Sequence, residues 1–280
     1  MKRMYLLGSP VAHSKSPLMH NEAFSLLNLD YHYSALDVKS EDLASTIQGL
    51  RDSDVRGFNL TMPHKTAACQ FCNSLSPAAQ LIGSINTVVN DNGVFTGHAT
   101  DGIGFMRAIS TAGCDIKDKK MTVLGAGGAA TAIFVQVALD GVSEITIFSR
   151  RGNFFSRAEK IIQDLKSYSS SNISLYDFDD ETILRKEIQE SALLVNATSV
   201  GMAPNTDASI ITDKKMFHKD LFVADIIYNP EETKFLRLAK EAGCQTQNGL
   251  NMLLYQGAEA FKLWTGHEMP VSIIKEKFFT

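Results

Sequence analysis

Apolar and polar positions along this chain form two repeating patterns. Short continuous apolar runs, typical of buried strands, alternate with longer stretches in which apolar residues recur at helical spacing. In the N-terminal part the order predicts strand, helix, strand, helix, strand, a hairpin and a further helix. The predicted ranges are 3–8, 17–27, 33–38, 40–50, 56–61, 84–90 with 94–97, and 101–112.

Residue types at the ends of these segments support the assignment. Ser16 is placed to cap the first helix, and Pro17 fits its first position, where a missing N–H does no harm. Ser40 is predicted to cap the second helix in the same way. The apolar runs on either side of Asp91-Asn92-Gly93 are predicted to pair as a hairpin, because these residues have the composition of a tight turn.

From about residue 120 strands and helices alternate without a hairpin. Such alternation predicts a parallel sheet joined by right-handed crossovers. The predicted strands are 121–124, 144–148, 173–176, 193–197 and 221–227. The predicted helices are a segment ending at 139, 156–166, a segment ending near 190, 231–242, 249–264 and 270–278.

These patterns predict an α/β protein of two domains. The first, residues 1–112 joined by the C-terminal helices in 249–280, is expected to be an open α/β domain for substrate binding and catalysis. The second, residues 113–248, is expected to be a Rossmann-type doubly wound domain that binds a dinucleotide. We expect a hinge at 113–119 and a cleft between the domains.

Composition narrows the class of protein. The chain has 280 residues, of which 44% are apolar, so it can form a substantial core. A net charge of -4 gives no sign of nucleic-acid binding, and no apolar run is long enough to cross a bilayer. Gly8-Ser9-Pro10 interrupts the basic and apolar start, which is predicted to be a strand and not a signal peptide. We therefore expect a cytoplasmic protein.

Cysteine usage points to no special chemistry. Cys69 and Cys72 form a Cys-x-x-Cys pair on a predicted helix, for which a redox pair or half of a zinc site is the functional interpretation. No second pair and no neighbouring histidines complete a metal set. Small buried side chains are the preferred interpretation, and no metal is expected.

The glycine-rich turn after the strand 121–124 is the strongest chemical signal. It follows an apolar run and opens an alanine-rich helix, the context in which a pyrophosphate lies on free backbone N–H groups. Gly125 would permit the tight turn, Gly127 the close approach of phosphate, and Ala130 close packing of helix on sheet. The predicted cofactor-binding residues of this turn are Gly125, Ala126, Gly127, Gly128 and Ala129.

The end of the next strand bears on which dinucleotide binds. NAD-specific sites usually place a carboxylate there, against the ribose 2′-hydroxyl. This chain has Ser149-Arg150-Arg151 instead, and guanidinium groups suit a 2′-phosphate. The residues favour NADP, with NAD as the alternative, and a solvated basic turn is the non-functional interpretation.

Polar residues also cluster in loops of the N-terminal part. In open α/β sheets ligands bind beyond the carboxyl ends of strands, and Thr61 and Lys65 follow such an end. Each cluster alone has a structural interpretation, as a helix cap, a surface charge or a turn. Their occurrence beside a dinucleotide domain favours a substrate site. The four clusters are 13–17, 59–65, 83–87 and 97–102.

A series of short motifs runs through the chain in a fixed order. The motifs are Ser14-x-Ser16-Pro17, Asn59-Leu60-Thr61-Met62-Pro63-His64-Lys65, Ile85-Asn86-Thr87, Thr100-Asp101-Gly102, Gly125-Ala126-Gly127-Gly128-Ala129, Asn196-Ala197-Thr198-Ser199-Val200-Gly201-Met202, Tyr228-Asn229-Pro230, and Asn248-Gly249-Leu250-Asn251-Met252-Leu253 with Gln256-Gly257-Ala258. This series resembles the shikimate/quinate dehydrogenase family over essentially the whole chain. Phe154-Phe155 and the segment 254–259 are most similar to the branch that accepts quinate as well as shikimate.

The resemblance implies roles for individual residues. Lys65 would be the catalytic acid/base, paired with Asp101. A proton held within hydrogen-bond reach of the reacting oxygen suits an alcohol oxidation whose hydride goes to a nicotinamide. The implied substrate-binding residues are Ser14, Ser16, Thr61, Asn86, Asp101, Tyr228 and Gln256. The implied cofactor-binding residues besides the glycine turn are Ser149, Arg150, Arg151, Ile226 and Gly249.

The implied reaction is the reversible, NADP-dependent reduction of 3-dehydroshikimate to shikimate on the chorismate pathway to aromatic amino acids. Two departures from the family pattern bear on the cofactor. Members of the quinate-accepting branch often carry an acid after the paired basic residues, where this chain has Gly152-Asn153. Ser149 stands where many NADP-specific members have asparagine. NADP is the predicted cofactor and NAD the alternative.

Two other functions stay open from the sequence. One is a quinate/shikimate dehydrogenase that works in quinate catabolism with NAD or NADP. The other is a non-catalytic sensor of the acid and the nucleotide, ranked lower because Lys65 and Asp101 are both present and no DNA-reading segment is seen. The expected partners are small molecules, namely shikimate, 3-dehydroshikimate and, in the alternative, quinate. Neither nucleic acid nor membrane is an expected partner, and the expected state is a monomer or a homodimer.

Overall fold

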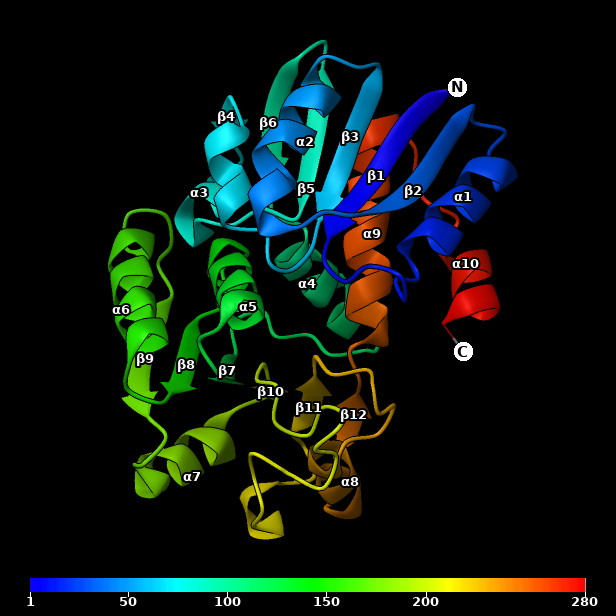
Figure 1. Cartoon of the computed structure of the whole chain (residues 1–280). Helices are drawn as coiled ribbons and strands as arrows, with labels where there is room; N and C mark the ends of the chain where they lie inside the picture. Colours follow the sequence, from blue (N-terminus) through cyan, green and yellow to red (C-terminus); the bar gives the residue numbers. More distant parts are fainter. Residues whose placement is uncertain (280) are drawn as a thin grey trace. The chain divides into compact units, whose positions relative to one another are not determined.

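The computed structural model describes residues 1–279, which divide into two compact units (Figure 1). Unit 1 comprises residues 1–104 and the chain from 254 onward, and unit 2 comprises residues 105–253. Both boundaries fall within a helix, α4 (Asp101–Thr111) and α9 (Leu250–Thr265). The domain boundaries predicted after residues 112 and 248 lie next to the ends of these helices and stay a prediction, as does the hinge.

Unit 1 is built on a mixed six-stranded sheet of order β2-β1-β3-β5-β6-β4. β1 runs parallel to β2 and β3, and β5 is antiparallel to β3 and β6. The predicted hairpin is confirmed, because Asn92 and Gly93 take left-handed φ values of 54° and 88° between the paired residues Asp91 and Val94. The strands are β1 (Lys2–Gly8), β2 (Tyr31–Asp37), β3 (Val55–Leu60), β4 (Ser74–Leu75), β5 (Thr87–Asp91) and β6 (Val94–His98).

Two predicted helix caps in unit 1 are wrong. Ser16 is the first residue of α1, and Pro17 lies beside it in the first turn, where proline is tolerated. The N-cap residue is Lys15, whose side chain does not cap the helix. Ser40 begins a short 3₁₀ turn that leads into α2, and no side chain caps either segment. The helical segments are α1 (Ser16–Leu26), η1 (Ser40–Asp42), α2 (Leu43–Arg51), η2 (Ala67–Phe71), α3 (Pro77–Ile82) and α10 (Val271–Phe278).

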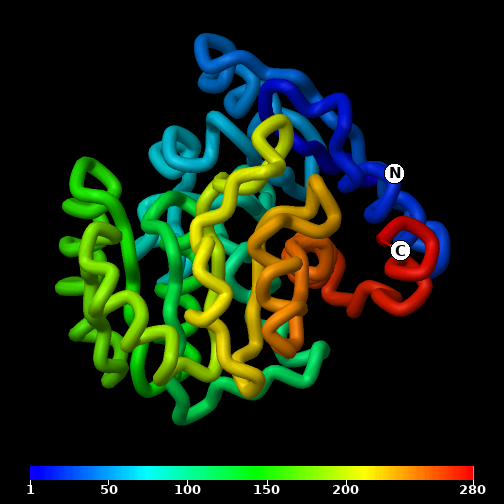
Figure 2. The backbone as a smooth tube through the Cα atoms, turned by 90° about the horizontal axis from the view of Figure 1, so that it is seen from below, coloured from blue at the N-terminus to red at the C-terminus, as the bar shows by residue number. Residues whose placement is uncertain are grey.

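The C-terminal helices return to the N-terminal sheet. Trp264 of α9 is buried, and its Nε1 donates to the Val88 carbonyl of β5 at 2.9 Å. Gly57 makes room for this contact, since a Cβ there would lie 2.4 Å from Trp264 Nε1. α10 lies beside α1 (Figure 2), and Lys277 forms an ion pair with Glu22 at 2.7 Å.

Unit 2 contains a six-stranded parallel sheet of order β12-β11-β10-β7-β8-β9. This order confirms the predicted Rossmann-type fold, in which ligands bind beyond the carboxyl ends of the central strands. The strands are β7 (Lys120–Leu124), β8 (Glu144–Ser149), β9 (Asn172–Asp177), β10 (Leu193–Asn196), β11 (Phe222–Asp225) and β12 (Gln245–Gln247). The helical segments are α5 (Gly128–Leu139), α6 (Asn153–Leu165), α7 (Glu181–Glu190), η3 (Lys214–Met216) and α8 (Lys234–Glu241).

Helix α5 is the most apolar helical segment of unit 2. Its residues 130–135 are all buried, because apolar side chains and alanines occupy nearly every face. Ala130 is fully buried in the first turn, where a small side chain lets the helix pack closely. Throughout residues 1–279, no helix combines the length and the apolar character that a membrane crossing needs.

Candidate active site

A lysine–aspartate pair lies at the carboxyl end of the unit 1 sheet. Lys65 follows β3 by a short loop, and Asp101 is the first residue of α4. Lys65 Nζ is 2.6 Å from Asp101 Oδ2, and the two side chains are 33% and 19% exposed. The predicted catalytic residues are therefore in contact, and the amine is accessible to a ligand.

Buried contacts hold the loop that carries Lys65. His64 is 1% exposed, and its Nε2 donates to the Val38 carbonyl at 2.6 Å. The Lys65 carbonyl accepts a hydrogen bond from the Ile85 N–H at 2.9 Å. A ring in the core and a backbone hydrogen bond thus fix the chain on both sides of the Lys65 side chain.

Thr61 lies directly after β3, close to β1. Its N–H donates to the Leu7 carbonyl at 2.9 Å. A Cβ at Gly8 would lie 2.2 Å from the Thr61 Cγ2, so the absence of a side chain at Gly8 allows Thr61 to lie this close.

Asn86 joins the lysine–aspartate pair to α9. It is 3% exposed, and its Nδ2 lies 3.0 Å from Asp101 Oδ1 and 3.1 Å from Gln256 Oε1. The same Nδ2 lies 2.9 Å from Thr100 Oγ1, and Asn86 Oδ1 accepts from the Thr100 N–H at 2.7 Å. Asn86 Nδ2 has two protons but three acceptor oxygens within hydrogen-bonding distance. These oxygens can therefore also accept a hydrogen bond from a ligand hydroxyl.

The position of Gln256 depends on a close helix crossing. α4 and α9 meet at Gly104, where a Cβ would lie 2.5 Å from the Gln256 backbone nitrogen. Only a residue without a side chain permits this approach. The crossing holds Gln256 Oε1 within 3.1 Å of Asn86 Nδ2.

Ser14 and Ser16 lie at the start of α1. Ser14 Oγ accepts from the Ser16 N–H at 3.2 Å, and Ser16 is 8% exposed. Lys15, the N-cap residue, makes no side-chain cap, and the first turn contains no acidic residue. Two hydroxyls at this helix N-terminus suit an anion such as a carboxylate.

Two buried residues with no predicted role connect these groups. The Tyr33 hydroxyl donates to Asn59 Oδ1 at 2.8 Å, and the Ser16 side chain is within its hydrogen-bonding reach. Burial raises the pKa of Tyr33 well above its ordinary value, and the contact with Ser16 opposes that shift. Asn59 Nδ2 donates to the Asn86 carbonyl at 2.9 Å. A polar residue inside the apolar strand β3, Asn59, was the sequence signal that could have revealed this connection.

In unit 2 the glycine turn has the geometry predicted for a phosphate site. Gly125 takes a left-handed φ of 115°, and a Cβ there would lie 2.9 Å from the Ala197 carbonyl oxygen. Added Cβ atoms at Gly127 and Gly128 would meet nothing within 4 Å. Gly127 precedes α5, and no side chain caps that helix, so its first N–H groups are open to a ligand. The turn fits a pyrophosphate.

The residues predicted to bind the adenosine part of the cofactor lie at the end of β8. Ser149 is buried, and Arg150 and Arg151 are exposed. Arg150 lines a cavity of about 680 Å³ together with Thr198 and Ser199, which follow β10. The Arg151 guanidinium stacks over a phenylalanine ring at the start of α6.

The remaining predicted residues lie in two places: Ile226 and Tyr228 are on the loop after β11, and Gly249 directly precedes α9. Ile226 and Gly249 are in contact, because a Cβ at Gly249 would lie 2.0 Å from the Ile226 carbonyl oxygen. The Gly249 N–H donates to the Ile227 carbonyl at 3.0 Å. Tyr228 lies on the same loop with 47% of its surface exposed, and it is the one predicted substrate residue in unit 2.

A buried carboxyl organises that loop. Asp225 is 2% exposed and accepts hydrogen bonds from Asn196 Nδ2, the Ile227 N–H and Thr233 Oγ1 at 3.1, 3.0 and 2.7 Å. Burial raises its pKa to about 6, and the three hydrogen bonds oppose the shift. The carboxyl fixes the backbone that leads to Ile226 and Tyr228.

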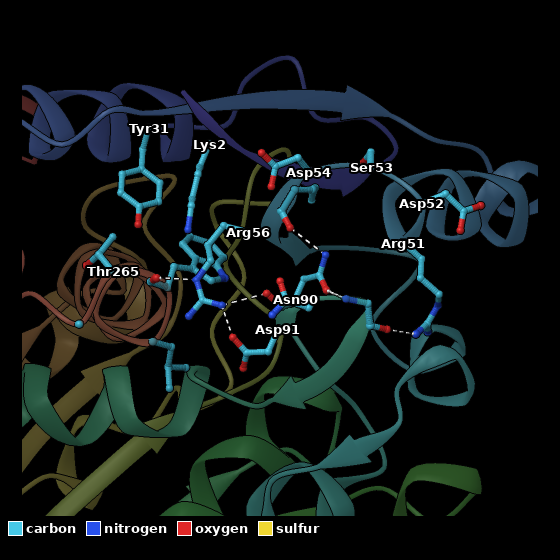
Figure 3. Close-up of a pocket in the computed structure, with 16 residues that line it drawn as sticks. Lys2, Tyr31, Arg51, Asp52, Ser53, Asp54, Arg56, Asn90, Asp91 and Thr265 are labelled. Carbon is cyan, nitrogen blue, oxygen red and sulfur yellow. Dashed lines mark hydrogen bonds and ion pairs between the residues drawn. The ribbon is translucent and has the colours of Figure 1, made fainter.

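A polar cavity of unit 1, of about 700 Å³, lies at the end of the sheet where β1 and β3 begin (Figure 3). It is lined by the starts of β1 and β3, and none of the predicted site residues borders it. Arg56 donates to the carbonyls of Trp264 and Asn90, both at 2.8 Å. Its cationic group holds the end of the sheet to α9, which is a structural role.

No metal centre is found in the described part of the chain, where no cluster of three or more histidine, cysteine, aspartate or glutamate side chains could hold an ion. Cys72 forms no disulfide, and burial raises the pKa of its thiol to about 11. A thiol with a raised pKa lacks the thiolate that redox or metal chemistry requires. Cys69 lies on the 3₁₀ segment η2, so the predicted helix at this pair is wrong in type.

Comparison with known proteins finds relatives along the whole chain. The family model described as the shikimate dehydrogenase substrate binding domain matches residues 6–88. The model described as the shikimate 5'-dehydrogenase C-terminal domain matches residues 249–277. A shikimate dehydrogenase (NADP(+)) from Listeria monocytogenes is 51% identical over 274 residues, which are 98% of this chain and 94% of the relative.

Solved structures share the fold. The shikimate 5-dehydrogenase of Listeria monocytogenes, in complex with shikimate and NAD, has a TM-score of 0.96 and 50% identity, over 100% of this chain and 96% of its own. A quinate dehydrogenase from Corynebacterium glutamicum, in complex with NAD, has a TM-score of 0.88 and 28% identity, over 99% and 98%. Both of these structures contain NAD, whereas the name of the sequence relative specifies NADP(+).

Proposed function

This chain belongs to the shikimate dehydrogenase family, and we propose that it catalyses the reversible, NADP-dependent reduction of 3-dehydroshikimate to shikimate. The reaction is a step toward aromatic amino acids. The observation that carries the proposal is the contact of Lys65 with Asp101 at 2.6 Å, inside a cluster that also contains Asn86 and Gln256. An amine with a fixed partner and a ring of hydroxyl-binding groups suits a polyhydroxylated ring.

We assign proton transfer to Lys65. The nicotinamide, when bound, gives a hydride to the ring ketone or takes one from the alcohol. Lys65 Nζ donates a proton to the oxygen in the first direction and removes it in the second. Asp101 holds the amine in place and orients its proton, because its other oxygen is fixed by Asn86.

Substrate recognition is assigned to groups that converge from several elements. The hydroxyls of Ser14 and Ser16, at the start of α1, bind the ring carboxylate. The ring hydroxyls are bound by side chains that donate and accept hydrogen bonds. These are Thr61, Asn86, Asp101 and Gln256, with Tyr228 as a further substrate contact.

The cofactor is assigned to unit 2, and the open glycine turn supports this assignment. The backbone from Gly125 through Ala129 binds the pyrophosphate at the start of α5. Ser149, Arg150 and Arg151 bind the adenosine side, where a guanidinium suits the 2′-phosphate of NADP. Ile226 and Gly249 lie against the nicotinamide in this proposal.

The proposal also covers the compartment, the ligands and the oligomeric state. We place the enzyme in the cytoplasm, since Cys72, Cys114 and Cys244 are unbridged thiols, as a reducing compartment favours. Its ligands are shikimate and a nicotinamide nucleotide, and we propose that the chain works as a monomer or a homodimer.

A quinate dehydrogenase that uses NAD is the second candidate, because Phe154-Phe155 and the segment 254–259 are most similar to the quinate-accepting branch. Ser149 also stands where many NADP-specific members have asparagine. Steady-state kinetics on the purified chain, with shikimate and quinate and with NADP and NAD, separate the candidates. We expect the highest kcat/KM for shikimate with NADP. A higher value for quinate with NAD would favour the second candidate, and no turnover in any of the four combinations would contradict both.

A further inference from the structure

An acid lies beside the end of β8, on the neighbouring strand. β8 and β9 pair in parallel, with Ser149 opposite Asp177. Asp177 Oδ2 is 3.1 Å from Arg151 Nε, and the two side chains are 20% and 70% exposed. No carboxylate follows β8, but Asp177 at the end of β9 lies beside it and is bound to Arg151.

The Arg151 guanidinium is held at two points. Its Nε donates to Asp177, and its plane lies over the Phe155 ring, with Cζ 4.1 Å from the ring centroid. These are its partners within residues 1–279, so both terminal nitrogens remain available as donors. Over the same residues the Arg150 guanidinium makes no hydrogen bond or ion pair with the protein. The two arginines therefore differ, since only Arg151 is paired with a carboxylate.

This difference bears on the group that distinguishes the two dinucleotides. The 2′-phosphate of NADP carries about -1.5 to -2 charges near neutral pH, by analogy with other phosphate monoesters. NAD has a neutral hydroxyl at that position. An anion near Arg151 repels the phosphate of NADP and leaves NAD almost unaffected, so Asp177 narrows the difference in affinity between the two.

We propose that Asp177 is a specificity-determining residue that weakens the preference of this chain for NADP over NAD by offsetting the charge of Arg151. The proposal rests on the proposed function, because it assumes a nicotinamide dinucleotide at the β8 end. Asp177 acts through Arg151 and through its own field, and it takes no part in the chemistry of the substrate.

Asp177→Asn separates charge from position. Asp177 accepts from Arg151 Nε through Oδ2 and from the Asp179 N–H through Oδ1, both at 3.1 Å. Asparagine keeps the size of the side chain and one acceptor oxygen for Arg151 Nε, while the negative charge is removed. The test is a calorimetric titration of oxidised NADP and NAD into the purified full chain. We expect the Kd of NADP to fall about two- to fivefold, the effect of removing one nearby charge in a medium of high effective dielectric constant, and the Kd of NAD to change less than twofold.

Two further variants make the test specific. Combining Asp177→Asn with Arg151→Gln should return the Kd of NADP to about that of the unmodified chain, because the double variant loses one negative and one positive charge. Asp164→Asn, an exposed change on α6, is the matched control and should leave both Kd values unchanged. An unchanged Kd of NADP in Asp177→Asn, or an equal change for both nucleotides, would overturn this proposal alone. If neither nucleotide binds the unmodified chain, the proposed function fails, and this proposal with it.

Discussion

At the scale of single residues, Asp225 is a buried carboxyl that opposes folding when it is charged. Burial raises its pKa from 3.8 to about 6, despite hydrogen bonds from Thr233, Ile227 and Asn196. The folded chain therefore binds this proton more tightly than the unfolded chain does. The stability that Asp225 contributes is fully present below pH 3.8 and is lost as the pH rises through about 6.

Asp225→Asn should remove this pH dependence. The amide keeps an acceptor for Asn196 and Ile227 and carries no charge at any pH. We expect the free energy of unfolding of the variant, relative to the unmodified chain, to rise by about 1–3 kcal/mol between pH 4 and pH 7. Urea unfolding at several pH values measures the difference. Asp207→Asn, at an exposed position, is the control, and a difference that stays flat or falls with pH would refute the raised pKa.

The sequence pattern alone left Lys65 and Asp101 with structural interpretations, and their pairing was implied only by the resemblance to the family. The structure places the two side chains in contact. Tyr33 carried no signal because an aromatic residue in a strand is ordinarily a core residue. Its role as a hydrogen-bond partner of Asn59 depends on a fully buried hydroxyl, which a sequence pattern does not reveal.

At the scale of elements, the crossing of α4 and α9 sets the position of Gln256, a proposed substrate-binding residue. Gly104→Ala would place a methyl group 2.5 Å from the Gln256 backbone, so the helices must move apart. We expect a loss of about 1–3 kcal/mol in stability from this overpacking. We also expect the KM of shikimate to rise roughly three- to tenfold, the effect of weakening one hydrogen bond.

Gly49→Ala is the matched control for this prediction. It lies in α2, and an added Cβ there would meet nothing within 4 Å. The control should gain up to about 1 kcal/mol in stability, since alanine favours helix over glycine, with no change in KM. Thermal unfolding and shikimate kinetics on both variants test the pair. An unchanged KM in Gly104→Ala would show that the crossing does not position Gln256.

Elements with a strong apolar pattern were predicted, and short polar ones were not. The strands of the parallel sheet are continuous apolar runs, so β7, β8, β10 and β11 lie where the pattern placed them. β12 consists of Gln245–Gln247, a polar edge strand whose pairing with β11 comes from the backbone alone. α3 and β4 were missed because six and two residues are too few to show a period.

At the scale of the whole molecule, the two units contain different parts of the proposed chemistry. Unit 1 holds the amine, the carboxylate and the groups that bind ring hydroxyls. Unit 2 holds the open glycine turn and the arginines of the adenosine side. The alternation of strands and helices predicted the division into an open α/β unit and a Rossmann-type unit. In the structure the chain belongs to unit 1 again from residue 254 onward.

The central claim is that Lys65 transfers the proton to and from the ring oxygen. The most direct test is Lys65→Ala, with kcat for shikimate oxidation measured at saturating NADP and the Kd of shikimate measured by calorimetry. We expect kcat to fall by about 10²- to 10⁴-fold and the Kd to rise less than about tenfold, because the amine contributes mainly to the transition state. Lys166→Ala, at an exposed position after α6, should match the unmodified chain. A kcat in Lys65→Ala within a fewfold of that control would contradict the account.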